Sequence, residues 1–329
     1  MKRFDYVVVG GGSAGCTVAS RLSENGEYSV ALLEAGGTHN NPLISIPFNF
    51  AFTVPKGSHN WSFETVPQPG LNGRIGYQPR GKVLGGSSSI NAMVYIRGAK
   101  EDYDNWQALG NRGWSYEDVL PFFRKAQNRQ KGANEFHGIG GPLSVSPPRS
   151  PNPLNDTFIQ AGVECQIPRN DDFNGATQEG IGFYELTQDN GRRCSTAHAY
   201  LTPAKNRENL TIFKRSIAEK VMIENGRAIA VRAKIDGRAQ IIRANKEVIL
   251  SCGAFQSPQL LLLSGIGPKS KLEEHKIDQV LELPGVGENL TDHLDYSLIY
   301  ESDSEYCLGR NARSVFRVAM NQLQYLIFK

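Results

Sequence analysis

The sequence predicts an α/β fold built around a parallel sheet, and three observations point to this class. An apolar run at residues 5–9 is followed at once by a glycine-rich turn at residues 10–15. Val18 and Leu22 then recur at helical spacing, and a second apolar run follows at residues 30–33. A strand, a sharp turn, a helix and a further strand in this order form the repeating unit of a parallel sheet that has helices on its faces.

The turn after the first strand has the composition of a nucleotide-binding turn. Gly10 can make the sharp turn, Gly12 lets the backbone approach a pyrophosphate, and Gly15 lets the helix touch the strand. The unpaired N–H groups at the start of the helix, around Ser13 and Ala14, attract phosphate groups. We therefore predict that a dinucleotide binds here. A purely structural turn is the alternative, because glycine-rich turns also occur without a ligand.

An acidic residue ends the second strand. Glu34 follows Gly15 by nineteen residues, close to where an acid holds ribose hydroxyls in dinucleotide sites. The order of strand, helix, second strand and acid favours a nucleotide site over a structural turn. A carboxylate at this position repels a 2′-phosphate, and NAD and FAD both remain compatible with the pattern.

Two further glycine-rich segments bear on the prediction of a ligand site. Residues 81–91 place two adjacent glycines and three serines before an apolar stretch, which suits a backbone pressed against a flat or anionic ligand. The alternative is a small-residue loop packed on a strand. Residues 253–267 follow an apolar strand at residues 247–252 and predict a turn, a buried helix and a glycine stop. Pro258 is expected in the first turn of that helix, with Ser257 as its cap.

Together the three segments resemble the glucose-methanol-choline (GMC) family of FAD-dependent oxidoreductases. Residues 81–104 are similar to the first diagnostic pattern of the family and residues 253–267 to the second, and the resemblance extends over the whole chain. It implies FAD rather than NAD. It also implies an FAD/NAD(P)-binding Rossmann-like domain, α/β in its core and α+β overall, with a partial cap or substrate domain.

The resemblance also implies which residues hold FAD. The ADP half is held by Gly10, Gly12, Gly15 and Glu34, with Ser13, Ala14 and Ala35 beside them. The pyrophosphate and isoalloxazine portions are lined by Val83, Gly86, Ser87, Asn91, Ala92, Met93 and Val94. Trp61 is similar to the family's loop near the flavin, and Val221 to the position whose backbone approaches adenine. For these two, an anchoring aromatic and a core valine are the alternatives. Residues 90–92 hold no histidine for a covalent link, so we expect non-covalent FAD.

The domain organisation follows from the resemblance and from turn residues. Asn225-Gly226 and Asp236-Gly237 break the stretch 210–252 into a strand meander with hairpin turns. The FAD-binding domain is expected to be discontinuous. The expected parts are its first part at residues 1–100, a cap or substrate-side insertion at 101–209, its second part at 210–300, and the start of a truncated substrate domain at 301–329.

The chemistry that the resemblance implies is oxidation of an alcohol, in which a base takes the hydroxyl proton and a hydride passes to flavin N5. The family's histidine base lies in a C-terminal segment, and nothing resembling it occurs before Lys329. We therefore expect the C-terminal part of the family fold to be missing and assign no catalytic residue. His293 resembles a structural turn, and His198 lacks the surroundings of a nucleophile site. The remaining histidines lie in polar stretches typical of loops or helix surfaces: His39, His59, His137 and His275.

Three functions remain open at this point. The first is an FAD-dependent alcohol dehydrogenase of the choline dehydrogenase type, with a small alcohol as substrate and a quinone or oxygen as electron acceptor. The second is a flavin-binding fragment that lacks activity because the histidine segment is absent. The third is an NAD-dependent dehydrogenase that uses the glycine turn differently.

The composition bears on the partners and on the cellular compartment that we expect for the protein. The net charge of +3 comes from 36 basic and 33 acidic residues without long runs of one sign, so we expect no nucleic-acid partner. Five cysteines without metal-type spacing predict a reducing compartment and no metal. No secretory leader or membrane span is apparent, which predicts the cytoplasm, with peripheral association at the inner membrane face as the alternative.

The last residues predict an amphipathic helix. Its apolar stripe consists of Phe316, Met320, Leu323 and Ile327. Such a face normally packs on more protein, so the chain is expected to be interrupted. Docking on its own domain is one alternative. A membrane-surface helix is another, with Arg310, Arg313 and Arg317 on or near it.

Overall fold

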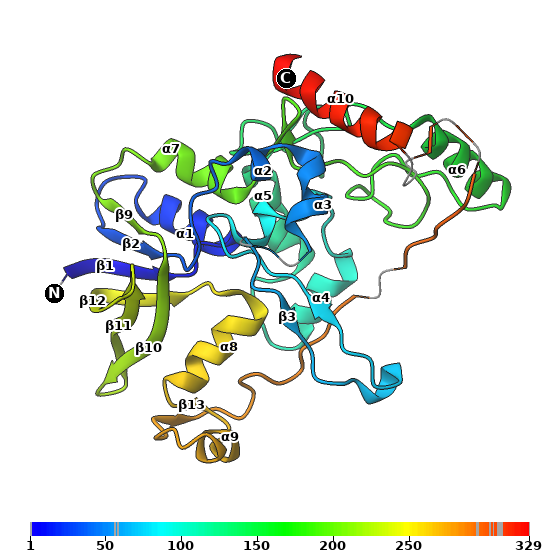
Figure 1. Ribbon diagram of the computed structural model, residues 1–329. Helices are drawn as coiled ribbons and strands as arrows, with labels where there is room; N and C mark the ends of the chain where they lie inside the picture. Colours follow the sequence, from blue (N-terminus) through cyan, green and yellow to red (C-terminus); the bar gives the residue numbers. More distant parts are fainter. Residues whose placement is uncertain are drawn as a thin grey trace. The chain divides into compact units, whose positions relative to one another are not determined.

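The computed structural model describes residues 2–55, 57, 59–293, 296–302, 304, 306–307 and 312–328. The chain divides into two compact units, each formed from two stretches of sequence. The first unit comprises Met1–Met93 and Arg193–Thr291, and the second comprises Val94–Arg192 and Asp292–Lys329. Figure 1 shows their helices and strands, coloured along the sequence.

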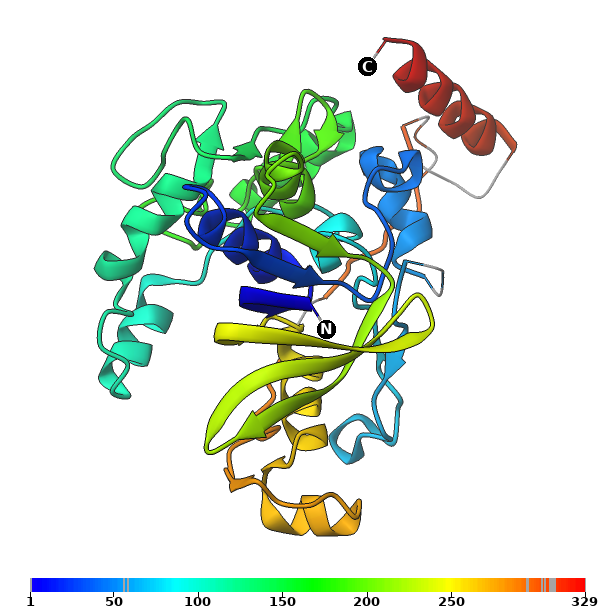
Figure 2. The ribbon, with the colours of Figure 1, turned by 90° about the vertical axis from the view of Figure 1, so that its left-hand side faces the viewer.

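A six-stranded sheet forms the centre of the first unit. Its strands are β1 (Lys2–Val9), β2 (Val30–Leu33), β9 (Leu210–Phe213), β10 (Ser216–Glu224), β11 (Arg227–Ile235) and β12 (Arg238–Leu250). The order across the sheet is β10-β11-β12-β1-β2-β9. Strands β12, β1, β2 and β9 run parallel, whereas β10, β11 and β12 form an antiparallel meander. In Figure 2 the meander, coloured yellow-green to yellow, continues the sheet beyond β1.

Helices cover both faces of the parallel strands. They are α1 (Ser13–Leu22), the π-helical turn η4 (Ala197–Leu201) and α7 (Thr202–Ala204) on one face, and α8 (Gly253–Leu263) on the other. Side chains alternate along a strand, so Val8 and Leu32 pack toward α1 while Val7 and Leu33 pack toward Leu260 of α8. All of these strand residues are at most 1% exposed. The continuous apolar runs therefore serve a sheet that is buried on both faces.

Short elements complete the first unit. They are α2 (Pro42–Ser45), η1 (Pro47–Asn49), α3 (Phe50–Thr53), β3 (Phe63–Glu64), η2 (Pro69–Leu71), β4 (Tyr77–Gln78), η3 (Gly86–Ser89), β13 (Ile266–Gly267), α9 (Lys269–Glu274) and β14 (Leu281–Glu282).

The expected elements of the first unit are largely confirmed. The second strand has the predicted bounds, the first begins three residues earlier, and the strand expected at residues 247–252 is the end of β12. Both expected hairpin turns are present, with Asn225 at φ 51° and Asp236 at φ 44°. A positive φ at the first turn residue, followed by glycine, is the backbone that a tight hairpin needs.

The expected start of α8 was wrong. The helix begins at Gly253, whose φ of +80° lets the chain turn directly from strand to helix. Pro258 is therefore the sixth helical residue rather than a first-turn residue. Ser257 lies inside the helix, and its Oγ accepts a hydrogen bond of 3.1 Å from the backbone N–H of Cys252.

The second unit consists of short elements joined by long loops. They are α4 (Lys100–Ala108), α5 (Tyr116–Ala126), β5 (Gln127–Arg129), β6 (Leu143–Val145), α6 (Pro153–Glu164), β7 (Gln188–Asp189), β8 (Arg192–Arg193) and α10 (Ala312–Phe328). Strands β5 and β6 are parallel, and β7 and β8 form a short hairpin where the chain returns to the first unit. Among the described residues, the large buried apolar clusters all belong to the first unit.

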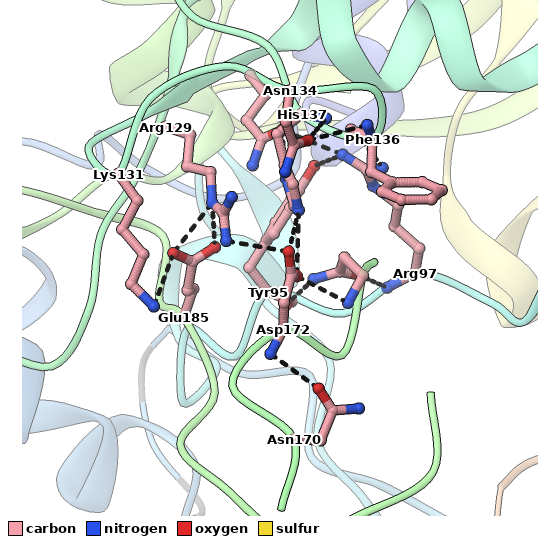
Figure 3. Close-up of polar contacts among 12 residues, drawn as sticks. Tyr95, Arg97, Arg129, Lys131, Asn134, Phe136, His137, Asn170, Asp172 and Glu185 are labelled. Atoms are coloured by element: carbon pink, nitrogen blue, oxygen red, sulfur yellow. Dashed lines mark hydrogen bonds and ion pairs between the residues drawn. The ribbon is translucent and has the colours of Figure 1, made fainter. Parts of the chain in front are cut away.

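The second unit contains a buried polar network (Figure 3). The Nε of Arg129 lies 3.1 and 2.9 Å from the two carboxylate oxygens of Glu185, and its Nη2 lies 3.2 Å from Asp172 Oδ2. The His137 Nε2 is 2.9 Å from the same Asp172 oxygen, and its Nδ1 is 3.1 Å from Gln127 Oε1. Charged groups can be buried together in this way because each has a partner of opposite charge or a hydrogen bond.

The pKa of Asp172 reflects the opposing effects of burial and of its hydrogen-bonded and charged partners. Burial raises the pKa of the Asp172 carboxyl, but the hydrogen bond from His137 and the charge of Arg129 outweigh it and hold that pKa below its usual value. The expectation that His137 lies on a loop or helix surface was wrong, because its side chain is fully buried. Its partners come from segments distant in sequence, so its local polar surroundings carried no sign of burial.

Helix α10 carries the expected apolar stripe. Its side chains are exposed, with Phe316 at 68% and Ile327 at 62%. Arg310 lies outside the described residues, as does the side chain of Arg313. Of the described helices, none is both long and apolar enough to cross a bilayer.

Substitution of Glu185 by Gln is expected to destabilise the chain by about 3 kcal/mol, because it leaves the buried guanidinium of Arg129 with one acidic partner in place of two. Urea unfolding measures this free energy. Asp171→Asn is the matched control, since Asp171 pairs with Arg169 at the surface and should cost less than about 1 kcal/mol. Equal effects of the two substitutions would show that the network does not stabilise the fold.

Candidate FAD-binding site

A cavity of about 520 Å³ opens in the first unit where β1, β2 and β12 end. The carboxyl ends of parallel strands meet at one edge of a sheet, which is where open α/β folds place their ligands. Nine of the predicted site residues line this cavity: Gly10, Gly12, Ser13, Ala14, Glu34, Ala35, Trp61, Gly86 and Ser87. Its volume lies in the range of small-molecule sites.

The three glycines of the first turn have different physical roles. A Cβ on Gly10 would lie 2.5 Å from Ser251 O, and a Cβ on Gly15 would collide with the Gly10 carbonyl, so packing within the chain excludes larger residues at both. Gly12 differs, because the atom closest to a Cβ there is 3.9 Å away and its φ of −79° suits any residue. The free space beside Gly12 belongs to the cavity. The backbone at Gly12 therefore leaves room for a ligand to approach it closely.

Two helices begin at the cavity without a side-chain cap. Helix α1 has Gly12 as its N-cap and no acidic residue in its first turn, and Ser13 and Ala14 are exposed. Helix α8 likewise begins at Cys252 and Gly253, which line the same cavity. The first N–H groups of both helices are therefore free for an anion, and both helix dipoles favour negative charge there.

The three glycine-rich segments meet at this cavity, as the sequence predicts. The backbone N–H of Gly85 donates to Gly11 O at 2.7 Å, and a Cβ on Gly86 would lie 2.7 Å from Gly12 Cα. The third segment is joined through Ser251, whose N–H donates to the carbonyl of Val9 at 2.7 Å. The segments thus form one continuous backbone surface.

Glu34 is buried at the edge of the cavity. Its Oε2 accepts from the backbone N–H of Gly11 at 2.8 Å, and its Oε1 accepts from that of Gly36 at 2.7 Å. Burial raises the pKa of Glu34 to about 7, although both hydrogen bonds and the nearby charge of Lys82 oppose the rise. Each carboxylate oxygen keeps a lone pair with which it could accept a ribose hydroxyl.

The wall opposite the glycine turn comes from the start of β10. The N–H of Ser216 donates to Glu34 O at 2.8 Å, and Ile217 and Ala218 line the cavity. Val221 does not line it. That residue is 5% exposed and its N–H donates to Ser264 Oγ at 2.8 Å, whereas Ala218 lines the cavity.

Aromatic and cationic side chains border the cavity. Trp61 stacks on Phe63 with a centroid distance of 5.8 Å, and the Lys82 ammonium lies 4.4 Å from the centre of the Trp61 ring. The guanidinium of Arg80 lies 4.5 Å from the centre of the Phe255 ring. Sequence reasoning missed Arg80 and Phe255, although Arg80 directly precedes the first diagnostic segment and Phe255 lies inside the second.

The other predicted site residues do not line the cavity. Gly15 and Val83 are buried behind its wall, and Met93 is buried with φ +64°. Asn91 and Ala92 are exposed outside the lining, and Val94 belongs to the second unit.

The cavity lining includes no histidine among the described residues. The backbone N–H of His293 bonds to the Asp292 carboxylate at the surface, and the backbone N–H of His198 bonds to Ser195 Oγ. Neither residue lines the cavity.

Glu34→Gln is expected to alter how the stability of the free chain depends on pH. The folded-state pKa of Glu34, about 7, lies above its ordinary value of 4.5, so the folded chain keeps a proton that the unfolded chain releases between these two values. Stability contributed by this proton is complete below pH 4.5 and is lost as the pH rises to 7, on the order of 3 kcal/mol. Urea unfolding between pH 4.5 and 8 should show this loss in the parent chain only.

Glu24→Gln is the matched control, because Glu24 is exposed and pairs with Arg21. It should keep the pH profile of the parent chain. A profile of Glu34→Gln that parallels the parent would contradict the prediction.

Comparison with known proteins identifies several flavoenzymes. An oxygen-dependent choline dehydrogenase of Sinorhizobium fredii is 46% identical over 292 residues, which is 89% of this chain and 53% of that protein. One of Brucella suis biovar 1 is 44% identical over 325 residues, 99% of this chain and 59% of that protein. The chain thus spans about half the length of the curated relatives it matches.

Solved structures give the same result. Pyridoxine 4-oxidase from Mesorbium loti is similar with a TM-score of 0.81 and 34% identity, over 85% of this chain and 55% of that one. A formate oxidase from Aspergillus oryzae RIB40, solved to study FAD modification, has a TM-score of 0.82 and 30% identity, over 89% and 52% of the two chains. The fold is therefore an α/β FAD-binding, Rossmann-like one, and FAD is the cofactor that the comparisons support.

The free space at Gly12, the two uncapped helices and Glu34 fit such a dinucleotide. Residues 4–295 match the GMC oxidoreductase family, and the chain belongs to that family.

Proposed function

We propose that this chain forms the FAD-binding part of an oxidoreductase that converts an alcohol to an aldehyde. The observation that supports this most strongly is the meeting of three glycine-rich backbones at one cavity, with two uncapped helix N-termini directed at it. FAD, when bound, supplies the hydride acceptor at flavin N5. The chain's own residues bind and orient this cofactor.

The proposed assignment of residues follows the cavity from end to end. The N-terminus of α1, from Gly12 to Ala14, holds the pyrophosphate, and Glu34 holds the ribose of the ADP half. The backbone of Ala218 approaches the adenine in place of Val221. The flavin then lies at the other end, beside Ser87 and the segment that leads to Asn91.

The division into units supports a proposal for the domains. The first unit corresponds to the FAD-binding domain, and the second contributes to the cap or substrate side. In this proposal the FAD-binding domain is discontinuous, as expected, because an insertion separates its two parts in the sequence.

The names of the relatives suggest the substrate and the electron acceptor. Relatives at 43–47% identity are oxygen-dependent choline dehydrogenases, so we propose choline or a similar small alcohol as substrate and oxygen as acceptor. A quinone is the alternative acceptor.

A second candidate function is FAD binding without catalysis by this chain. The absence of histidine from the described cavity lining favours it, because no general base near neutral pKa faces the expected flavin. One experiment separates the two functions. The purified chain is titrated with FAD, and choline or a simple primary alcohol is then added without oxygen.

Loss of the flavin absorbance on adding alcohol supports the alcohol oxidoreductase. Bound FAD that keeps its absorbance supports the binding function. A chain that is folded by circular dichroism but binds no FAD contradicts both.

Gly12→Ala is expected to leave the free chain stable but to weaken FAD binding roughly ten- to a hundredfold, or about 1.4–2.8 kcal/mol. The added methyl meets no protein atom closer than 3.9 Å, whereas it occupies the space proposed for the pyrophosphate. Thermal unfolding and FAD titration by fluorescence measure the two effects.

Gly37→Ala is the matched control, since a Cβ at Gly37 has no protein atom within 4 Å and Gly37 does not line the cavity. It should change neither property. An unchanged FAD affinity in Gly12→Ala would contradict the proposal that the pyrophosphate lies beside Gly12.

A further inference from the structure

Arg193 is a buried cation that has no acidic partner. Its residue exposure is 3%, and in the part of the chain that the structure describes it forms no ion pair with a carboxylate. Burial lowers the pKa of its guanidinium to about 10, so the group is charged at neutral pH. It differs in this from Arg129, whose buried charge is balanced by two carboxylates.

Neutral oxygens hold the Arg193 side chain in place. Its Nε donates to the carbonyl of Ile44 at 2.9 Å, and its Nη1 donates to the carbonyl of Ser88 at 3.2 Å and to Asn91 Oδ1 at 2.9 Å. These contacts satisfy N–H groups but leave one positive charge uncompensated. A buried charge without a counter-charge is costly, so its presence indicates a role for the charge itself.

The charge contacts the end of the second glycine-rich segment. Ser88 and Asn91, which it binds, follow Gly86 and Ser87 of the cavity lining. The Asn91 Oδ1 also accepts from the backbone N–H of Met93 at 3.1 Å. Met93 has a φ of +64°, a strained value for this residue, and Arg193 holds the Asn91 side chain that bonds to this turn.

We propose that Arg193 makes the chain bind reduced FAD more tightly than oxidised FAD. The inference rests on the proposed function, in which α1 takes the pyrophosphate and the flavin extends along the segment that Arg193 supports. Reduction adds two electrons to the ring, and with the uptake of one proton the ring carries one negative charge. A fixed positive charge close to the ring stabilises this form over the neutral oxidised one.

A different role of Arg193 makes a different prediction. If the guanidinium balances the pyrophosphate, or serves only to hold the turn, its loss weakens oxidised and reduced FAD equally, because the pyrophosphate charge is the same in both. The ratio of the two dissociation constants therefore separates the roles.

The experiment measures the affinity of the full chain for oxidised FAD in air and for reduced FAD without oxygen. In Arg193→Gln the preference for reduced FAD should fall about tenfold relative to the parent, which corresponds to about 30 mV in the two-electron potential of the bound flavin. Arg193→Lys keeps the charge, so its ratio should stay within about twofold while both affinities fall.

Arg207→Gln is the matched control. Arg207 lies in the first unit as Arg193 does, is half-buried, and donates to Ser20 O and Ser23 Oγ, at the opposite end of α1 from the cavity. Its substitution should leave the ratio unchanged.

Three results are decisive. Equal weakening of both redox forms in Arg193→Gln overturns the inference and leaves the proposed function intact. A folded parent chain that binds neither form overturns both. If Arg193→Gln does not fold, Arg193→Ala refolded with millimolar ethylguanidinium replaces it, and the preference for reduced FAD must then rise with ethylguanidinium but not with sodium chloride of equal ionic strength.

Discussion

The close approach of two backbones, at Gly12 and Gly86, is the constraint on which the cavity depends. No side chain fits on Gly86, since a Cβ there would lie 2.7 Å from Gly12 Cα. This contact brings the second glycine-rich segment against the end of β1, and Ser251 brings the third to the same place through the carbonyl of Val9. Once the backbones meet, the N-termini of α1 and α8 both open onto the resulting space. Backbone packing therefore places the unpaired N–H groups of two helix N-termini at one cavity.

Sequence patterns predicted the elements whose conformation depends on residues close together in the sequence. The strand, turn, helix and strand of residues 2–33, and both hairpin turns of the meander, follow from periodicity and from residues that tolerate positive φ. The position of Val221 relative to the cavity could not be predicted in this way. Its assignment came from the family resemblance and not from a local pattern, and strand β10 has an irregularity in its pairing between Ala218 and Lys220, so no local pattern decides which residue of this strand meets the cavity.

Residues whose environment depends on distant partners could not be recognised from the sequence. His137 has polar neighbours along the chain, but Gln127 and Asp172 enclose it. Arg193 is surrounded by small and polar residues, and only the fold shows that its partners are oxygens of Ile44, Ser88 and Asn91. The two units also differ in their buried contacts, since the large apolar clusters lie in the first and the buried network of charged side chains lies in the second. Their responses to salt and pH should therefore differ.

The position of β12 has a consequence for the synthesis of the chain on the ribosome. In the finished sheet β1 lies between β2 and β12, and Val7 pairs with Val248. A nascent chain therefore carries one unpaired edge of β1 until the whole second stretch of strands has emerged, and such an edge is open to pairing with other chains. The third glycine-rich segment, which lines part of the cavity, is synthesised directly after these strands. The lining of the cavity is consequently complete only after translation has passed residue 263.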